Sequence, residues 1–114
     1  MREQCVVVLV TCPTRAVAKR IATQVVQRRF AACVNILPGI ESQFWWKGRV
    51  DRCREVLLII KTTAAGIPRL TQAIISLHPY DVPEVIALPV VAGHTPYLKW
   101  VRATLIRSKS SPHP

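Results

Sequence analysis

Acidic residues are scarce in this chain, and long hydrophobic runs are absent. Only six of the 114 residues are Asp or Glu, against sixteen Lys and Arg, which leaves a formal net charge of +10. This balance suits anionic partners or simple solubility and does not choose between them. The first apolar run, Cys5 to Val10, is far shorter than the ~20 residues of a membrane helix. We therefore expect a cytoplasmic chain without membrane contact.

Several motifs that carry chemistry are also missing. The sequence has no G-x-x-x-x-G-K-[ST] loop, no G-x-G-x-x-G loop, no H-E-x-x-H and no G-x-S-x-G. Nucleotide-binding, zinc-protease and hydrolase functions therefore lack their required residues, and we expect no enzyme. The four cysteines include no C-x-x-C pair, so we expect free thiols rather than a disulfide framework.

The hydrophobic patterning that is present indicates one domain. Half of the residues are hydrophobic, which suits a filled core or a subunit with a buried interface. Cys5 to Thr11 is rich in β-branched residues and predicts a central strand. Thr14 can cap a following helix, whose apolar positions recur at helical spacing. These positions are Ala18, Ile21, Ala22 and Val25.

A long hairpin follows this helix. Its first strand begins at Ala32 and is interrupted by Pro38-Gly39, a pair that fits a β-bulge because Pro cannot donate to the ladder. Lys47-Gly48 marks the turn, and the return strand is expected to be buried only over Val56 to Ile60. Such a hairpin is longer than one small sheet can pair, so its distal half should project beyond the core.

Prolines punctuate the second half of the chain. Pro68 suits the first turn of a helix, and Pro79 should end that helix at His78. Residues 85–88 are apolar on both faces and predict a buried interior strand. Thr95-Pro96 then starts a last helix, with Thr as the cap and Pro in the first position.

These elements follow the order β-α-β-β-α-β with an additional C-terminal helix. The order is that of an α+β, ferredoxin-like fold, in which two helices cover one face of an antiparallel sheet. We place this single domain at residues 1–107 and expect residues 108–114 to be a disordered tail.

The segment from His78 to Glu84 presents an imidazole, a phenol and two carboxylates on backbone stiffened by prolines. His78, Glu84 and Cys12 are candidate ligands for a divalent metal, since imidazole, carboxylate and thiolate suit copper or zinc. Copper is favoured among these ions, so we expect weak Cu²⁺ binding through His78. Under the structural alternative, His78 caps helix carbonyls, Tyr80 closes an edge of the core, and Cys12 is incidental.

Aromatic residues near the hairpin turn form a second candidate site. Phe44, Trp45 and Trp46 would be costly to leave in water, so they predict a contact with another chain or, alternatively, a ligand pocket. We also assign Tyr80 and Lys61 to this pocket or interface. Alternatively, Lys61 forms a structural ion pair with Glu84 across neighbouring strands.

The two remaining cysteines of interest differ in their surroundings. Cys33 lies in an apolar strand and should be a buried small hydrophobe. Cys53 stands between Arg52 and Arg54, whose positive charges should lower its thiol pKa and make it reactive if it is exposed. No acid or imidazole partner for nucleophilic catalysis is apparent near it, so we expect an idle thiol.

Several of these stretches together resemble the CutA family of divalent-cation-tolerance proteins. The likeness is carried by residues 78–89, Ala31–Ile36 with Pro38-Gly39-Ile40, Trp46-Lys47-Gly48, Ile60-Lys61-Thr62 and Tyr97–Val101. The resemblance implies the same ferredoxin-like fold and a homotrimer. It also implies a binding or regulatory role in divalent-metal tolerance, without catalysis.

Two other functions share this topology. The order β-α-β-β-α-β is also that of the RNA-recognition motif, but Val56 to Ile60 occupy the strand where base-stacking aromatics would be needed. We therefore expect only non-specific nucleic-acid binding that weakens steeply with salt. A PII-like small-molecule sensor or a protein-interaction module is the main alternative, although the chain has no phosphate-binding glycine loop.

Overall fold

The computed structural model describes residues 3–106 of the chain. Its long elements are four strands and three helices. In chain order they are β1 (Cys5–Cys12), α1 (Arg15–Gln27), β2 (Cys33–Trp46), β3 (Arg49–Thr63), α2 (Ile67–Leu77), β4 (Ile86–Pro89) and α3 (Thr95–Thr104), with a short 3-10 turn, Ala64–Gly66, before α2.

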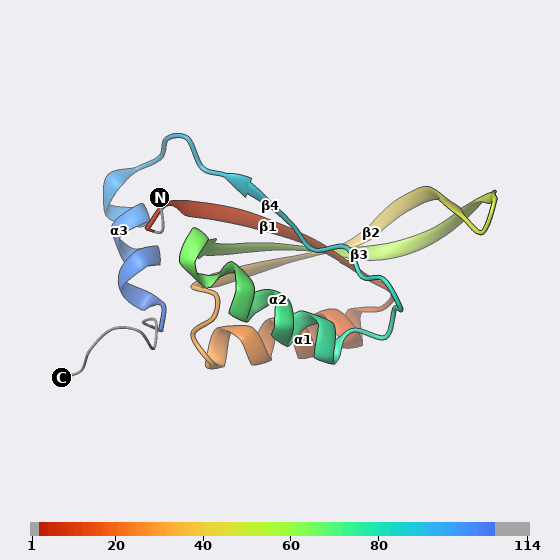
Figure 1. The fold of residues 1–114 in the computed structure, drawn as a ribbon, viewed down its shortest axis with the longest axis horizontal. Coiled ribbons are helices and arrows are strands. Elements are labelled where there is room, and N and C mark those ends of the chain that lie inside the picture. The colour runs from red at the N-terminus through yellow and green to blue at the C-terminus, as the bar shows by residue number, and fades with distance from the viewer. Residues whose placement is uncertain (1–2, 107–114) are drawn as a thin grey trace.

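The four strands form one antiparallel sheet in the order β2-β3-β1-β4 (Figure 1). Helices α1 and α2 lie together on one face of it. This arrangement confirms the predicted ferredoxin-like α+β fold. The predicted tail at 108–114 lies outside the described residues.

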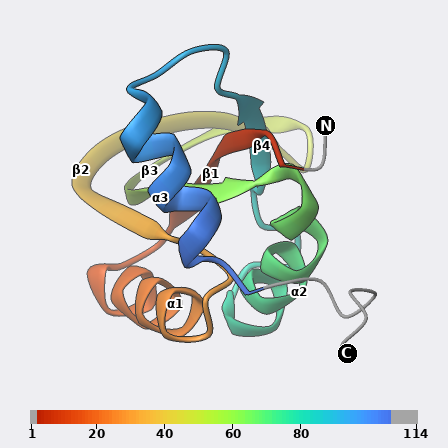
Figure 2. The same cartoon turned by 90° about the vertical axis from the view of Figure 1, so that its left-hand side faces the viewer.

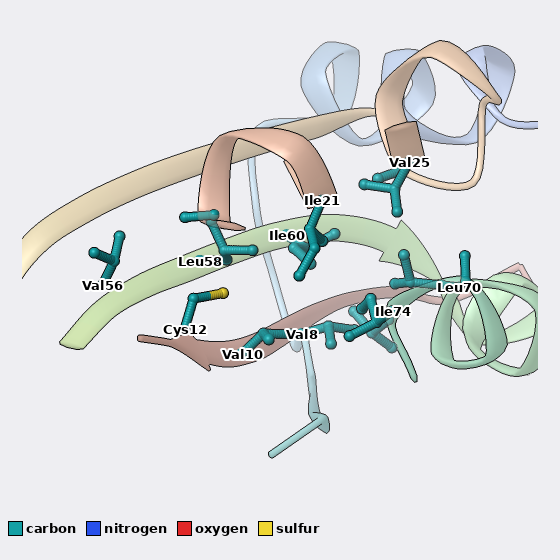
Figure 3. Packing of buried hydrophobic residues seen from close by; sticks show 14 residues of the cluster. Val8, Val10, Cys12, Ile21, Val25, Val56, Leu58, Ile60, Leu70 and Ile74 are labelled. Carbon is teal, nitrogen blue, oxygen red and sulfur yellow. The ribbon is translucent and has the colours of Figure 1, made fainter. Parts of the chain in front are cut away.

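The main core lies between the sheet and these two helices. Successive strand residues point to opposite faces, and every second residue of β1 and of the inner half of β3 faces the helices. Figure 3 shows these side chains meeting those of α1 and α2. The fully buried members include Val8, Val10, Leu58, Ile60, Ile21, Val25, Leu70 and Ile74, so the predicted core positions are confirmed.

Helix α3 covers one end of the other face of the sheet. Cys5 and Val6 are neighbours in β1, yet Val6 belongs to the main core and Cys5 packs with Val101 of α3 in a second cluster. The helix lies at the end of the sheet remote from the hairpin tip (Figures 1 and 2). The rest of this second face has no cover within residues 3–106.

Local sequence signals explain most of the element ends. The Thr14 hydroxyl accepts a hydrogen bond from the backbone N–H of Val17 at 3.2 Å, which confirms the predicted cap of α1. Helix α2 ends at His78, as Pro79 predicts. The predicted cap at Thr95 is wrong by one residue: His94 is the N-cap of α3 and makes no side-chain capping bond. Thr95 already has helical geometry.

The hairpin β2–β3 contains the predicted bulge. Its register shifts between Leu37 and Ile40, and Gly39 in the bulge has φ of +81°. Lys47 and Gly48 at the turn both have positive φ, which matches the twist of a tight two-residue hairpin. The chain extends 52 Å along its longest axis against 28 and 25 Å along the others, because this hairpin projects from the sheet (Figure 1).

The predicted burial of residues 85–88 is wrong in the protomer. Strand β4 pairs only with β1, so it forms an edge of the sheet, and all four of its residues are exposed. An apolar run on both faces was taken to mean an interior strand. Here the same run stands at an edge with nothing beyond it in the described part of the chain.

Candidate functional site

His78 joins the end of α2 to the end of β1. Its Nε2 lies 2.8 Å from the backbone carbonyl oxygen of Thr11, and its Nδ1 lies 3.2 Å from the backbone N of Tyr80. A carbonyl can only accept, so Nε2 carries the proton and Nδ1 accepts from the Tyr80 N–H. The imidazole is therefore buried and uses both nitrogens within the chain. The predicted alternative, in which His78 caps helix carbonyls, is wrong, because the carbonyl that its ring contacts belongs to β1.

Tyr80 donates a 2.7 Å hydrogen bond to the carboxylate of Glu55, a residue that the sequence analysis did not single out. Glu55 is buried at the point where β3 enters the sheet. Burial and this hydrogen bond raise the pKa of Tyr80 above its ordinary range, so the phenol stays protonated. A lone acid at the start of the apolar run 56–60 was the available signal for Glu55.

Cys12 and Glu84 lie in opposite environments. Cys12 is fully buried, and Figure 3 shows it among core side chains such as Leu58. Burial, with a smaller effect of the Glu55 charge, raises its thiol pKa to about 11. The protonated thiol is a poor metal ligand near neutral pH, because metals bind the thiolate. Glu84 is exposed just before β4.

The three predicted metal ligands therefore do not form a chelating cluster in the protomer. Among residues 3–106, no group of three or more His, Cys, Asp or Glu side chains is placed to hold a metal ion. His78 has one lone pair, on Nδ1, and that nitrogen already accepts a hydrogen bond. The donor set does not fit a resident divalent metal within one chain, and a weaker contact through His78 stays a prediction.

The predicted ion pair between Lys61 and Glu84 is wrong. Lys61 lies on β3, which is separated from β4 by β1, so the two residues are not on neighbouring strands. The Lys61 ammonium instead donates to the Asn35 side-chain oxygen and lies 4.0 Å from the sulfur of Cys33, both on β2. In the described part of the chain, the ion pair within 4.0 Å is Arg54 with Glu41, and it is fully at the surface.

Both remaining cysteines differ from expectation. Cys33 is only partly buried, because its side of β2 faces away from α1 and α2. The pKa of Cys53 is raised, by some burial and by the Glu55 and Asp51 charges, and not lowered. Strand geometry explains this, since Arg52 and Arg54 point to the face opposite Cys53.

The aromatic residues of the hairpin are exposed in the protomer. Trp45 is 74% exposed, Trp46 45% and Phe44 38%. Tyr80 and these residues do not converge on one pocket in the described chain. The site that the structure does assemble is the junction of His78, Tyr80 and Glu55, which ties the end of α2 to β1 and β3.

None of the helices described between residues 3 and 106 is long and apolar enough to cross a membrane.

Residues 6–104 match the family model described as CutA1 divalent ion tolerance protein. The chain is similar to a protein from Homo sapiens named Protein CutA, with 55% identity over 93 residues, which are 82% of this chain and 52% of that one. It thus spans about half the length of that relative.

Shorter relatives match over nearly their whole length. The Divalent-cation tolerance protein CutA of Thermus thermophilus is 48% identical over 96 residues, 84% of this chain and 93% of that one. The solved structure of CutA1 from Oryza sativa superposes with a TM-score of 0.89 at 46% identity, covering 92% of this chain and 96% of that one.

Proposed function

Because the chain belongs to the CutA1 divalent ion tolerance family, we propose that it acts in divalent-metal tolerance as a cytoplasmic, homotrimeric binding or regulatory protein without catalysis. The family membership confirms the resemblance found in the sequence. Trimeric assembly, location, copper binding and absence of catalysis are our proposals for this chain.

The distal hairpin is the observation that supports assembly most strongly. Residues 57–61 of β3 pair with both β2 and β1, whereas residues 49–55 pair with β2 alone. The distal half is therefore a two-stranded ribbon with both outer edges open in the described chain. An isolated two-stranded ribbon is marginally stable in water. Strands of a second copy would satisfy these edges and cover Trp45 and Trp46.

The uncovered second face of the sheet supports the same proposal. We define the open face as six apolar residues on four strands that share this side of the sheet by their pairing and lie outside the contact with α3. Leu37, Ile86 and Leu88 are each between 43% and 49% exposed. A contiguous apolar surface of this kind is typical of an interface. The residues of the open face are Leu9, Leu37, Leu57, Ile59, Ile86 and Leu88.

The number three comes from the family resemblance rather than from geometry. Edge pairing and an apolar face would also allow other closed rings. The hairpin and the open face lie at different places on each copy. In a closed ring, the hairpin of one copy would reach the next copy, so both surfaces would be used. Arginines 49, 52 and 54 would then lie at the rim, where their charge limits further strand addition.

Copper is expected to interact weakly, and through His78. The Nδ1 lone pair must give up its hydrogen bond from Tyr80 before it can bind an ion, which lowers the affinity. We expect His78→Ala to abolish this contact, whereas His94→Ala, which removes an exposed imidazole, should leave it unchanged. Calorimetric titration of Cu²⁺ into each variant measures the difference. Equal copper affinity in wild type and His78→Ala would remove His78 from the site.

Native mass measurement with and without Cu²⁺ and Zn²⁺ tests the proposal as a whole. It reports the number of chains and the number of bound ions in one experiment. A trimer that takes up copper supports both parts. A trimer that binds neither ion would leave assembly in place and favour the PII-like small-molecule or protein-interaction alternative over direct metal binding.

A further inference from the structure

A cavity unrelated to the His78 junction lies between β1, the segment 90–94 and α3. Its volume is about 260 Å³. Most ligand pockets are somewhat larger, at roughly 300–1,000 Å³, so this one suits a ligand smaller than a drug. The elements that line it lie at the end of the sheet remote from the hairpin, where α3 is close to the start of β1 (Figures 1 and 2).

The walls of this cavity are mainly apolar. Val7, Val90 and Leu98 supply aliphatic side chains from β1, from the segment after β4 and from α3. Gly93 brings its backbone close to α3, since a Cβ at that position would lie 3.3 Å from a methyl carbon of Leu98. An apolar lining of this kind suits a hydrocarbon group.

Lys61 is the charged residue in the lining of this cavity, and its ammonium lies on the β2 side, where Asn35 and Cys33 are. The Lys61 ammonium has three donor hydrogens, and its partners in the described chain are the Asn35 oxygen and, at 4.0 Å, the Cys33 sulfur. Neither partner is charged, and no carboxylate of residues 3–106 lies within 4.0 Å of it. A positive charge beside an apolar space, without a counter-charge, favours an anionic ligand.

A further feature of the lining favours an anion. The segment at Gly93 and His94 brings the start of α3 to the cavity, and this helix has no side-chain cap and no acid in its first turn. Free N–H groups there add positive potential.

We propose that this cavity binds a small carboxylate with an unbranched apolar tail, whose head pairs with Lys61 and whose tail lies along Val7, Val90 and Leu98. The site is separate from the proposed metal contact and goes beyond the proposed function. The two sites are separate, and their ligands have opposite charge, so each binding is measured in its own titration. Failure of one proposal therefore leaves the other unaffected.

Octanoate is a suitable probe, with octylammonium and 1-octanol as ligands of the same tail but reversed or absent charge. Calorimetric titration into the assembled wild-type protein should give binding of octanoate at least about tenfold tighter than of the other two. Lys61→Met keeps most of the aliphatic stem and should weaken octanoate about tenfold or more, without changing 1-octanol. Lys99→Met removes a charge from the exposed part of α3 and should change neither.

A second variant tests the cavity itself. Ala92 is exposed at its lining, so Ala92→Phe should place a ring at the opening without disturbing the core and should weaken all three ligands. If Lys61→Met does not fold, the titration of Ala92→Phe tests the proposal by itself. The proposal is overturned if octanoate does not bind the wild type at millimolar concentration, if octylammonium binds as tightly, or if folded Lys61→Met or Ala92→Phe binds octanoate like wild type.

Discussion

The two faces of the sheet are formed by the same strands but differ in how far they are buried. On the face toward α1 and α2, residues such as Val8, Val10, Leu58 and Ile60 are completely buried. On the open face, their immediate neighbours are half-buried or exposed, up to 49% for Ile86. Along the inner half of β3, residues therefore alternate between the buried helix-covered face, which we call the finished face, and the partly exposed open face.

This difference separates what the chain does alone from what we propose it does with other copies. The helix-covered face has its apolar partners within residues 3–106, so it can fold as a protomer. The open face and the distal hairpin leave apolar area and strand edges without partners in that same range. Burial of this second surface would stabilise an assembly by the same hydrophobic effect that stabilises the core.

The largest expected effect comes from a substitution on the finished face. Leu58→Ala should lower the free energy of unfolding by about 2–5 kcal/mol at every protein concentration, because it leaves a cavity in a fully buried site. Leu88→Ala on the open face should instead raise the concentration at which the assembly dissociates. Chemical denaturation and sedimentation of both variants measure these effects. If Leu88→Ala unfolds the dissociated protomer as severely as Leu58→Ala, the distinction between the faces fails.

A smaller effect is expected at the hairpin tip. Trp46 is about half exposed in the protomer, so covering the remainder should contribute about 2–3 kcal/mol per protomer to assembly. Trp46→Ala should therefore weaken association by that amount, as seen in dissociation on dilution. Cys53→Ser, on the neighbouring strand of the same ribbon, is the matched control and should change association little. A Trp46→Ala protein that associates like Cys53→Ser would remove the tip from the interface.

The smallest expected effect concerns alkaline pH and the finished face. The pKa of buried Cys12 is raised from 9.0 to about 11, so the folded state holds this proton more tightly than the unfolded state. Its contribution is complete below pH 9 and is lost as pH rises toward 11, at up to about 1.4 kcal/mol per pH unit. The pKa of Tyr80 is also raised, so its ionisation lowers stability further from about pH 10, with a smaller slope because the side chain is partly solvated.

Urea denaturation across this alkaline range tests the titration of Cys12. Cys12→Ala should make the decline of stability shallower between pH 9 and 10, before Tyr80 contributes. Val10→Ala is the control, because it removes methyl groups from the same core without removing a titrating group, so it should lower stability equally at each pH. Identical pH slopes in Cys12→Ala and Val10→Ala would contradict the account.

Local signals made much of the fold predictable. The Thr14 cap, the end of α2 before Pro79 and the bulge at Pro38-Gly39 each depend on a few adjacent residues, and the structure has all three. The exposure of β4 in the protomer was not predictable in this way. An apolar run looks the same at an interior position and at an edge that another chain covers, so its neighbours must be known.

The candidate site was less predictable, because its contacts are distant in sequence. Tyr80 and Glu55 are 25 residues apart, and His78 reaches a carbonyl 67 residues earlier. Residue type alone suggested metal ligands there, whereas pairing satisfied these groups within the chain. The predicted ion pair between Lys61 and Glu84 failed for the same reason, because it depended on the order of the strands in the sheet.

Sedimentation equilibrium of the wild-type protein at micromolar concentration, combined with quenching of tryptophan fluorescence, tests the central claim most directly. We predict a mass three times the 12.8 kDa of one chain, with Trp45 and Trp46 protected from the quencher until the assembly dissociates. A folded species of 12.8 kDa whose hairpin tryptophans are fully accessible would contradict the assembly and the interpretation of the hairpin together.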